Sequence, residues 1–176
     1  MTRRIRTALM LGLVGFTAHA AAEVSVPIHF AIENGQGQHI GSITATDSKY
    51  GLVLTPELKA LPPGMHGFHV HEKGNCTASQ QDGKSVLAGG AGPHYDPDGT
   101  KKHSTPWDDG GHRGDLPALY VDAQGNATMP VLAPRLKLSE IKGRALMIHA
   151  GSDNHSDHPQ PLGGGAGRIA CGVIPQ

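Results

Sequence analysis

Two histidines alternate with apolar residues in the stretch 67–76, and this stretch constrains the fold more than any other part of the chain. Successive side chains of a β-strand point to opposite faces, so His69 and His71 share one face. Phe68 and Val70 share the other face and belong to a core. Two imidazoles on one face of a strand make half of a metal site. The stretch therefore predicts a strand with metal ligands on one side and core contacts on the other.

The remaining ligands must come from histidines that are distant in sequence, and the chain supplies His94, His103, His112 and His149. His103 and His112 lie in one loop with Asp115, and His94 completes a set of three imidazoles and one carboxylate. Ligands of this kind suit Zn²⁺ in a closed tetrahedral site, which has a structural role. We expect this set, named here the Asp115 group, to hold its loop in place.

A second set, named here the four-histidine group, consists of His69, His71, His94 and His149. Four imidazoles without a thiolate suit Cu²⁺ in a roughly square-planar field, which leaves axial access for a small ligand. His94 belongs to both groups. An imidazole that has lost its second ring proton can bridge two metals as imidazolate if nearby cations hold the charge. The sequence therefore predicts two metals that share one ligand.

Residues 1–22 are predicted to be a secretory signal. Three arginines precede an apolar run over 8–17 and a small-residue cleavage site, and cleavage after Ala20 or after Ala22 fits equally well. The run is too short to anchor the chain across a membrane. Its start weakly suggests a twin-arginine signal, but the residues after the arginines match poorly, so the general secretory route is expected. Residues 23–176 are predicted to form a single domain.

The composition of the chain favours an all-β domain. Glycine (25) and proline (13) are abundant, and aromatic residues make up only 4%. Of the 15 basic residues three lie in the signal, which leaves 12 against 15 acidic residues, and nothing resembles a nucleic-acid footprint. In an oxidising compartment Cys76 and Cys171 most simply form one disulfide, although two free buried thiols are an alternative.

Eight short segments have the alternation or composition of strands: 23–34, 39–46, 51–58, 65–71, 116–122, 127–132, 144–149 and 168–175. The segments 116–122 and 127–132 are predicted to pair as a hairpin, and a helical turn is predicted around 139–142. Segments 72–113 and 150–167 are expected to be long loops without strands, which something must hold in place. The pattern predicts an antiparallel barrel or sandwich.

Through the two histidine groups and the motifs around them, the sequence resembles the copper,zinc superoxide dismutases of the bacterial periplasmic kind, over essentially the whole mature chain. The matching motifs are Gly67-Phe68-His69-Val70-His71 with Cys76, Gly92-Pro93-His94-Tyr95-Asp96-Pro97, His103 with His112-Arg113-Gly114-Asp115-Leu116, and Gly163-Gly164-Gly165 leading to Arg168-Ile169-Ala170-Cys171-Gly172-Val173-Ile174.

The resemblance implies a flattened, eight-stranded antiparallel Greek-key barrel with two long functional loops, located in the periplasm. It also implies superoxide dismutation with one copper and one zinc per subunit and superoxide as the small-molecule substrate. The four-histidine group would bind copper and the Asp115 group zinc, with His94 as the shared, catalytic ligand. Asp153 would orient one ligand of each metal, Arg168 would attract the substrate, and Cys76 would pair with Cys171.

Two questions stay open from the sequence. A periplasmic copper or zinc binding or delivery protein could use the same fold, although the four-histidine group and Arg168 favour the enzyme. Bacterial relatives include monomers and dimers, so a homodimer is one option. Trp107 would then either pack within its own loop or contact a second subunit, where tryptophan is enriched.

Overall fold

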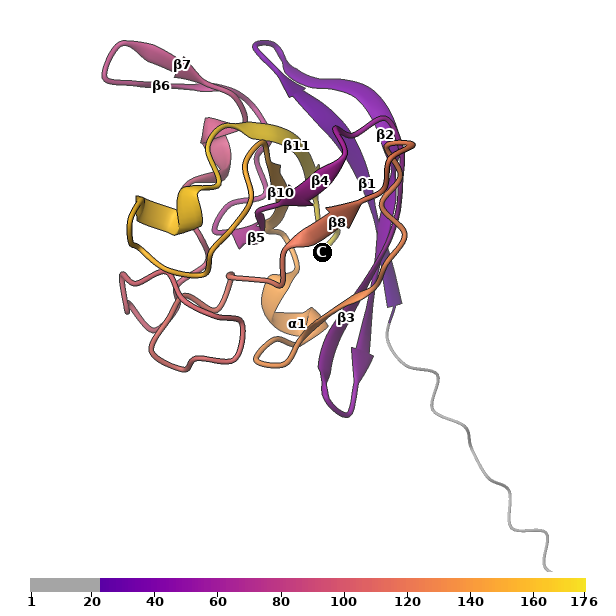
Figure 1. Cartoon of the computed structure of the whole chain (residues 1–176), viewed down its shortest axis with the longest axis vertical. Coiled ribbons are helices and arrows are strands. Elements are labelled where there is room, and N and C mark those ends of the chain that lie inside the picture. Colours follow the sequence, from indigo (N-terminus) through magenta and orange to yellow (C-terminus); the bar gives the residue numbers. More distant parts are fainter. Residues whose placement is uncertain (1–22) are drawn as a thin grey trace, which may run out of the picture.

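A seven-stranded antiparallel sheet curls around the core of the protein (Figure 1). The computed structural model describes residues 23–176, so the predicted signal over 1–22 lies outside the described residues. In spatial order the strands are β5 (Phe68–His71), β10 (Ala145–His149), β11 (Arg168–Val173), β1 (Glu23–Ile32), β2 (Gly35–Ser48), β3 (Gly51–Leu58) and β9 (Val131–Ala133).

A short ladder links the two edges of this sheet. β4 (Gly64–His66) pairs with β8 (Leu119–Val121), and the two lie in front of the curled sheet in Figure 1. Because β4 runs directly into β5 and β8 runs on toward β9, the ladder closes the sheet into a barrel. The antiparallel barrel predicted from the sequence is therefore confirmed.

Three details differ from the prediction. The predicted strand 65–71 is split at Gly67, whose N–H donates to Gly151 and whose carbonyl accepts from the N–H of His149. The predicted hairpin has its turn, since Asn126 and Asp122 are hydrogen-bonded across it, but the pairing is wrong. β8 pairs with β4, and β9 pairs with β3.

The third difference is a hairpin inside the first long loop, where no strand was predicted. β6 (Ser79–Gln81) pairs with β7 (Lys84–Val86) across Asp82 and Gly83. Both turn residues have positive φ, 51° and 73°, as a two-residue turn of this kind requires. The Asp-Gly pair was the signal for this hairpin. The part of the chain that the structure describes also contains three short helices, η1 (Gly89–Ala91), α1 (Leu138–Ile141) and η2 (Pro161–Gly164).

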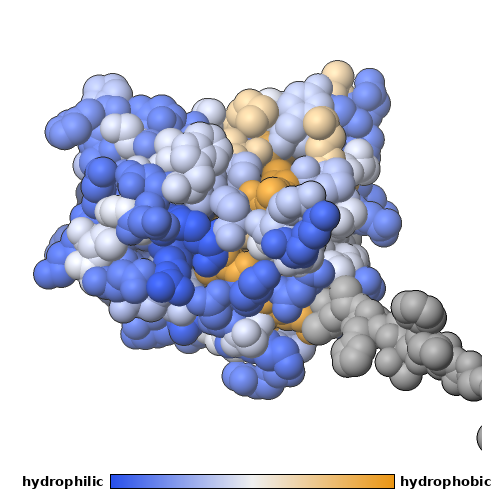
Figure 2. Space-filling view, turned by 90° about the horizontal axis from the view of Figure 1, so that it is seen from below, coloured by the Kyte–Doolittle hydropathy of each residue, from blue (hydrophilic) through white to orange (hydrophobic). Residues whose placement is uncertain are grey.

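The core lies inside the barrel, on the side of β5 opposite its histidines. Phe68 and Val70 of β5 pack there with Leu146 and Ile148 of β10, all at most 1% exposed. Burying each such side chain stabilises the fold by roughly 1.5–3 kcal/mol. On the face seen in Figure 2 hydrophobic residues show only in small areas of a mostly hydrophilic surface. β5 and β10 are thus held from the inside, and their outer faces are free to carry chemistry.

None of the helices in the described part of the chain has the length and apolar character needed to cross a membrane.

Candidate metal centre

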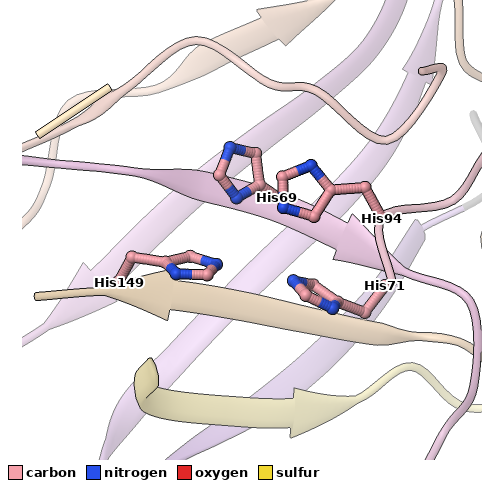
Figure 3. Close-up of side chains that lie close together, drawn as sticks. All are labelled: His69, His71, His94 and His149. Atoms are coloured by element: carbon pink, nitrogen blue, oxygen red, sulfur yellow. The ribbon is translucent and has the colours of Figure 1, made fainter. Parts of the chain in front are cut away.

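The four-histidine group gathers on the outer side of β5 and β10 (Figure 3). His69 and His71 project from β5, His149 ends β10, and His94 reaches in from the first long loop. All four side chains are buried, and one nitrogen from each lies within 4.8 Å of the others. The structure therefore brings together the four imidazoles that the sequence placed in one group.

Three of these rings each have one buried nitrogen without a hydrogen-bond partner among the described residues. The unpaired atoms are Nδ1 of His69, Nε2 of His71 and Nε2 of His149. A buried polar atom without a partner costs about 1–3 kcal/mol, so three at one place need an explanation. A metal ion bound by these lone pairs would supply one.

The other nitrogen of each ring is held by the protein, which fixes its orientation. Nδ1 of His71 donates to the carbonyl oxygen of Gly92 at 2.8 Å, and Nδ1 of His149 lies 3.3 Å from the carbonyl oxygen of Ala166. Nε2 of His69 donates to Asp153 at 2.8 Å. Such contacts set the tautomer of a ligand histidine and aim its free lone pair.

The Asp115 group converges on a single carboxylate oxygen. Oδ1 of Asp115 lies 2.8 Å from Nδ1 of His94, 3.0 Å from Nδ1 of His103 and 3.3 Å from Nδ1 of His112. The His103 contact lacks the geometry of a hydrogen bond, which leaves this buried nitrogen unpaired. Three imidazoles and one carboxylate are a donor set that suits Zn²⁺ in a tetrahedral site.

His94 lies between the two groups. Its Nδ1 faces Asp115, so its Nε2 is on the side of the other histidines. Its ring also stacks on His69, with centroids 3.9 Å apart. One nitrogen of His69 also lies within 4.8 Å of ligand atoms of His94, His103 and Asp115, a set that leaves out His112, although Nε2 of His69 is bound to Asp153. His94 is the residue whose two nitrogens serve different groups.

Asp153 is hydrogen-bonded to one histidine of each group. Its two carboxylate oxygens accept hydrogen bonds from Nε2 of His69 and Nε2 of His103, both at 2.8 Å. The residue comes from the second long loop and is only 8% exposed. One side chain therefore orients one member of each group.

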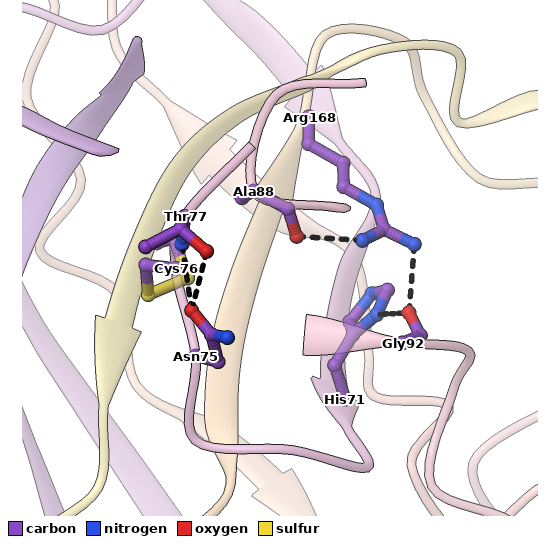
Figure 4. The surroundings of a disulfide bond; sticks show 8 residues. His71, Asn75, Cys76, Thr77, Ala88, Gly92 and Arg168 are labelled. Atoms are coloured by element: carbon purple, nitrogen blue, oxygen red, sulfur yellow. Dashed lines mark hydrogen bonds between the residues drawn. A yellow bond between two sulfur atoms is a disulfide. The ribbon is translucent and has the colours of Figure 1, made fainter. Parts of the chain in front are cut away.

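Arg168, at the start of β11, lies beside His71 of the four-histidine group (Figure 4). Its guanidinium donates to the carbonyl oxygens of Ala88 and Gly92, both at 2.7 Å. The segment that carries these acceptors is tied to β11 by a disulfide between Cys76 and Cys171, which confirms the predicted pairing. Among the described residues the guanidinium has backbone acceptors and no carboxylate partner, so its charge remains available to an anion.

Burial keeps the four-histidine group neutral. It lowers the pKa values of His69 and His71 well below the usual range, and that of His149 to about 4. The pKa of His94 is also lowered, chiefly by burial. Neutral imidazole is the form that binds a metal, so no proton has to be displaced at these rings near neutral pH.

The carboxylates of Asp115 and Asp153, unlike the four-histidine group, stay charged. Burial alone would raise the pKa of Asp115, yet the three histidines around it hold that pKa far below its usual range. Burial would likewise lower the pKa of His103, but the neighbouring carboxylates of Asp115 and Asp153 raise it to about 9. In the metal-free chain Asp115 is thus ionised and His103 holds a proton, which a divalent cation bound by this group would displace.

Two supporting residues gave no metal-site signal in the sequence. Arg135 donates to the carbonyl oxygens of Pro106, Gly111 and His112, at 3.0, 3.2 and 2.6 Å. His66 is 3% exposed and lies between the carbonyl oxygens of Pro62 and His149. Backbone acceptors leave no trace in the pattern of side chains, so the sequence does not show which carbonyl oxygens these two residues contact.

A family sequence model, related sequences and solved structures all match this chain to one family. The sequence model of the copper/zinc superoxide dismutase family matches residues 39–174. The Cu-Zn superoxide dismutase of Photobacterium leiognathi is 62% identical over 138 residues, covering 78% of this chain and 80% of that protein. The Cu-Zn superoxide dismutase of Escherichia coli K12 is 54% identical over 166 residues, or 94% of this chain and 95% of that protein. Among solved structures, Cu/Zn superoxide dismutase from Brucella abortus superposes with a TM-score of 0.85 at 47% identity, covering 87% of this chain and 99% of that chain.

Proposed function

Because the chain belongs to the copper/zinc superoxide dismutase family, we propose that its two histidine groups hold one copper and one zinc per chain. The reaction of the family converts two superoxide anions and two protons into O₂ and H₂O₂. Copper would lie in the four-histidine group and zinc in the Asp115 group. The observation that carries this assignment is the set of unpaired buried nitrogens on His69, His71 and His149.

The chemistry that the metals supply when bound is a copper ion that can accept and donate one electron, and a zinc ion that adds fixed positive charge. The residues of the chain do the rest. His94 holds a proton at Nε2 between the two halves of the reaction and then releases it, while Nδ1 stays on the Asp115 side. This makes His94 a catalytic residue in the proposal.

Arg168 would attract and position the anionic substrate. Its guanidinium is partly buried and held by two backbone carbonyls, so its location relative to His71 is fixed. The mature chain is net acidic, so the attraction has to be local. A cation beside a buried cluster focuses the field where the anion must arrive.

A periplasmic protein that only binds or delivers metal is the competing function. Metal content and superoxide dismutation, measured on one sample before and after copper removal, separate the two. The enzyme contains near one copper and one zinc per chain and recovers activity with copper alone. A sample that holds zinc and stays inactive when copper is supplied would support the delivery protein.

Two variants test the assignment of the residues. His149→Ala should abolish dismutation while zinc stays bound, because His149 belongs only to the four-histidine group. Asp115→Ala should release zinc first and loosen the loop around it. His158→Ala, an exposed histidine of the second long loop, is the matched control and should change neither. Full copper-dependent activity in His149→Ala would refute the copper site.

The site of action proposed for the mature chain is the periplasm, after removal of a signal over residues 1–22. The disulfide between Cys76 and Cys171 supports an oxidising compartment. The N-terminal residue of protein isolated from a periplasmic fraction tests this proposal. Ala21 or Glu23 is expected, whereas an intact Met1 in a cytosolic fraction would contradict it.

A homodimer is proposed on the evidence of Trp107. The side chain is 69% exposed, which argues against packing within its own loop and favours a contact with a second subunit. Sedimentation equilibrium of the wild type and of Trp107→Gln tests the contact. A dimer that dissociates more readily in the variant is expected, and a wild-type monomer at high concentration would refute it.

A further inference from the structure

We propose that His29 and His39 form a second, exposed metal site that takes a divalent transition metal, with Cu²⁺ the most tightly bound. The two residues lie opposite each other on the neighbouring strands β1 and β2. They share no residue with the four-histidine group or the Asp115 group. In the sheet, β10 and β11 separate β5, which carries His69 and His71, from β1.

Both imidazoles project from the outer face of the barrel. Ile28 precedes His29 and Ile40 follows His39, and both isoleucines are fully buried in the core. Because side chains alternate along a strand, the adjacent histidines point outward. The pairing shifts between Ile28 and His29, which marks a β-bulge. Bulges commonly re-aim side chains, and this one lies at the histidine pair.

The two rings have the spacing of a pair of metal ligands. Their centroids are 5.0 Å apart, with an angle of 59° between the planes. Within the four-histidine group His71 and His94 are also 5.0 Å apart, at 69°, and His69 and His149 are 4.8 Å apart. Two imidazoles that bind one metal at about 2.0–2.1 Å through their nitrogens keep a separation of this size. Little rearrangement would be needed to bind an ion.

The environment of His29 supplies an independent observation. Its Nδ1 is buried and has no hydrogen-bond partner among the described residues, the same condition found for the unpaired nitrogens of the four-histidine group. On its other side His29 lies opposite Cys171, which the disulfide anchors. His39, in contrast, is exposed. One ligand is therefore held in place and the other is open to solvent, from which a metal can enter.

The donor set determines the class of metal. Neutral imidazole suits Cu²⁺, Ni²⁺ and Zn²⁺, and among these the affinity is highest for Cu²⁺. Mg²⁺ and Ca²⁺ require oxygen ligands and are not expected to bind. Water would complete the coordination shell at this surface. A site of two protein ligands exchanges its metal with the solvent, unlike a closed site.

The experiment uses the holoprotein, already loaded with copper and zinc, and Cu²⁺ as the probe. Equilibrium dialysis measures further copper uptake, and electron paramagnetic resonance detects a second Cu²⁺ species with nitrogen ligands. The wild type is expected to take up about one more copper per chain. His29→Ala and His39→Ala should each weaken this uptake by at least about tenfold. His158→Ala, which removes an unrelated exposed histidine, should retain it.

The variants can be checked for folding without reference to the new site. Neither histidine touches the metal centre, so dismutation should be unchanged in both, and His29→Gln keeps a polar side chain at the half-buried position. Undiminished uptake in His29→Ala and His39→Ala would overturn the proposal. The absence of further uptake by the wild type, or its loss in His158→Ala, would overturn it as well.

Discussion

Arg168 and His71 donate hydrogen bonds to the same acceptor, the carbonyl oxygen of Gly92, at 2.7 and 2.8 Å (Figure 4). The position of the guanidinium relative to a proposed copper ligand is therefore set by one backbone atom. A shift of this segment would move both side chains together. Substitution of Arg168 can separate the effect of its charge on the rate from the effect of its hydrogen-bonding geometry.

For Arg168 we expect different outcomes with lysine and with glutamine. Arg168→Gln removes the charge and should lower kcat/KM by roughly tenfold or more, with a weaker dependence on ionic strength. Arg168→Lys keeps the charge but loses the two-pronged donor, so it should lower the rate less and retain the salt dependence. Pulse radiolysis at several salt concentrations measures both effects. Equal rates in the two variants would show that charge does not matter here.

Removal of Arg135 should loosen the loop that carries His112. The side chain holds three carbonyl oxygens of that loop, one of them that of His112 itself. Arg135→Gln is expected to weaken zinc affinity by about 10–100-fold, in the range known for residues that support metal ligands. Competition with a chelator measures this change.

Arg113 provides the matched control for Arg135. It lies next to His112 but makes its contacts with the carboxylates of Asp98 and Glu140. Arg113→Gln should leave zinc affinity near the wild-type value, because exposed ion pairs contribute little. If both variants lost zinc equally, the effect would come from the general charge of the loop.

Loss of the disulfide should destabilise the fold and loosen the support of Arg168. The bond joins residues 95 positions apart, for which the chain-entropy model gives roughly 4–5 kcal/mol. The variant with Cys76→Ser and Cys171→Ser together should therefore unfold at a lower concentration of guanidinium chloride. Ala88 and Gly92, which accept the hydrogen bonds of Arg168, lie in the segment tied down by Cys76. In the variant without the disulfide, the additional substitution Arg168→Gln should therefore lower the dismutation rate less than it does in the wild type. A variant with unchanged unfolding midpoint would contradict this account.

Acidification should destabilise the metal-free protein between about pH 6.5 and pH 4. The pKa of His149 is lowered by burial to about 4 in the folded chain, against about 6.5 when unfolded, and His69, His71 and His94 are shifted in the same direction. In this range the unfolded chain binds more protons than the folded one, so the free energy of unfolding falls as the pH falls. For His149 the full effect, reached below pH 4, is on the order of 3 kcal/mol.

His103 contributes little to the pH dependence of the free energy of unfolding below pH 6.5. Its pKa is raised to about 9, so its stabilising contribution is complete below pH 6.5 and is lost only as the pH rises toward 9. Urea unfolding of the metal-free protein at pH 6.5, 5.5 and 4.5 gives the slope, because this range lies below the one in which His103 loses its proton. His149→Gln should flatten it, and an unaltered slope in that variant would exclude His149 as a contributor.

The sequence predicted the barrel and the composition of the metal centre because both depend on side-chain types. Alternation around Phe68 and Val70 placed His69 and His71 on the outer face of a strand. The requirement for further imidazoles then selected His94 and His149, which the fold does bring together. The roles of these residues in binding copper remain a prediction.

Features determined by backbone groups could not be predicted in the same way. Carbonyl oxygens, which every residue carries, take part in the strand break at Gly67, accept the hydrogen bonds of Arg135 and contact both ring nitrogens of His66. The pairing of β8 and β9 with strands other than each other depends on how the barrel closes. Only the small hairpin at Asp82 and Gly83 had a sequence signal that was missed.

Under the proposed metal assignment, the carboxylate of Asp153 would couple two binding events. Each oxygen orients one histidine, so an ion that settles His69 also limits the motion of Asp153, and with it that of His103. Such a link is a coupling free energy, and it must be reciprocal. Whatever factor zinc adds to the affinity for copper, copper adds to the affinity for zinc. Because both histidines are ordered through one carboxylate, this factor is expected to exceed one, so that the first metal raises the affinity for the second.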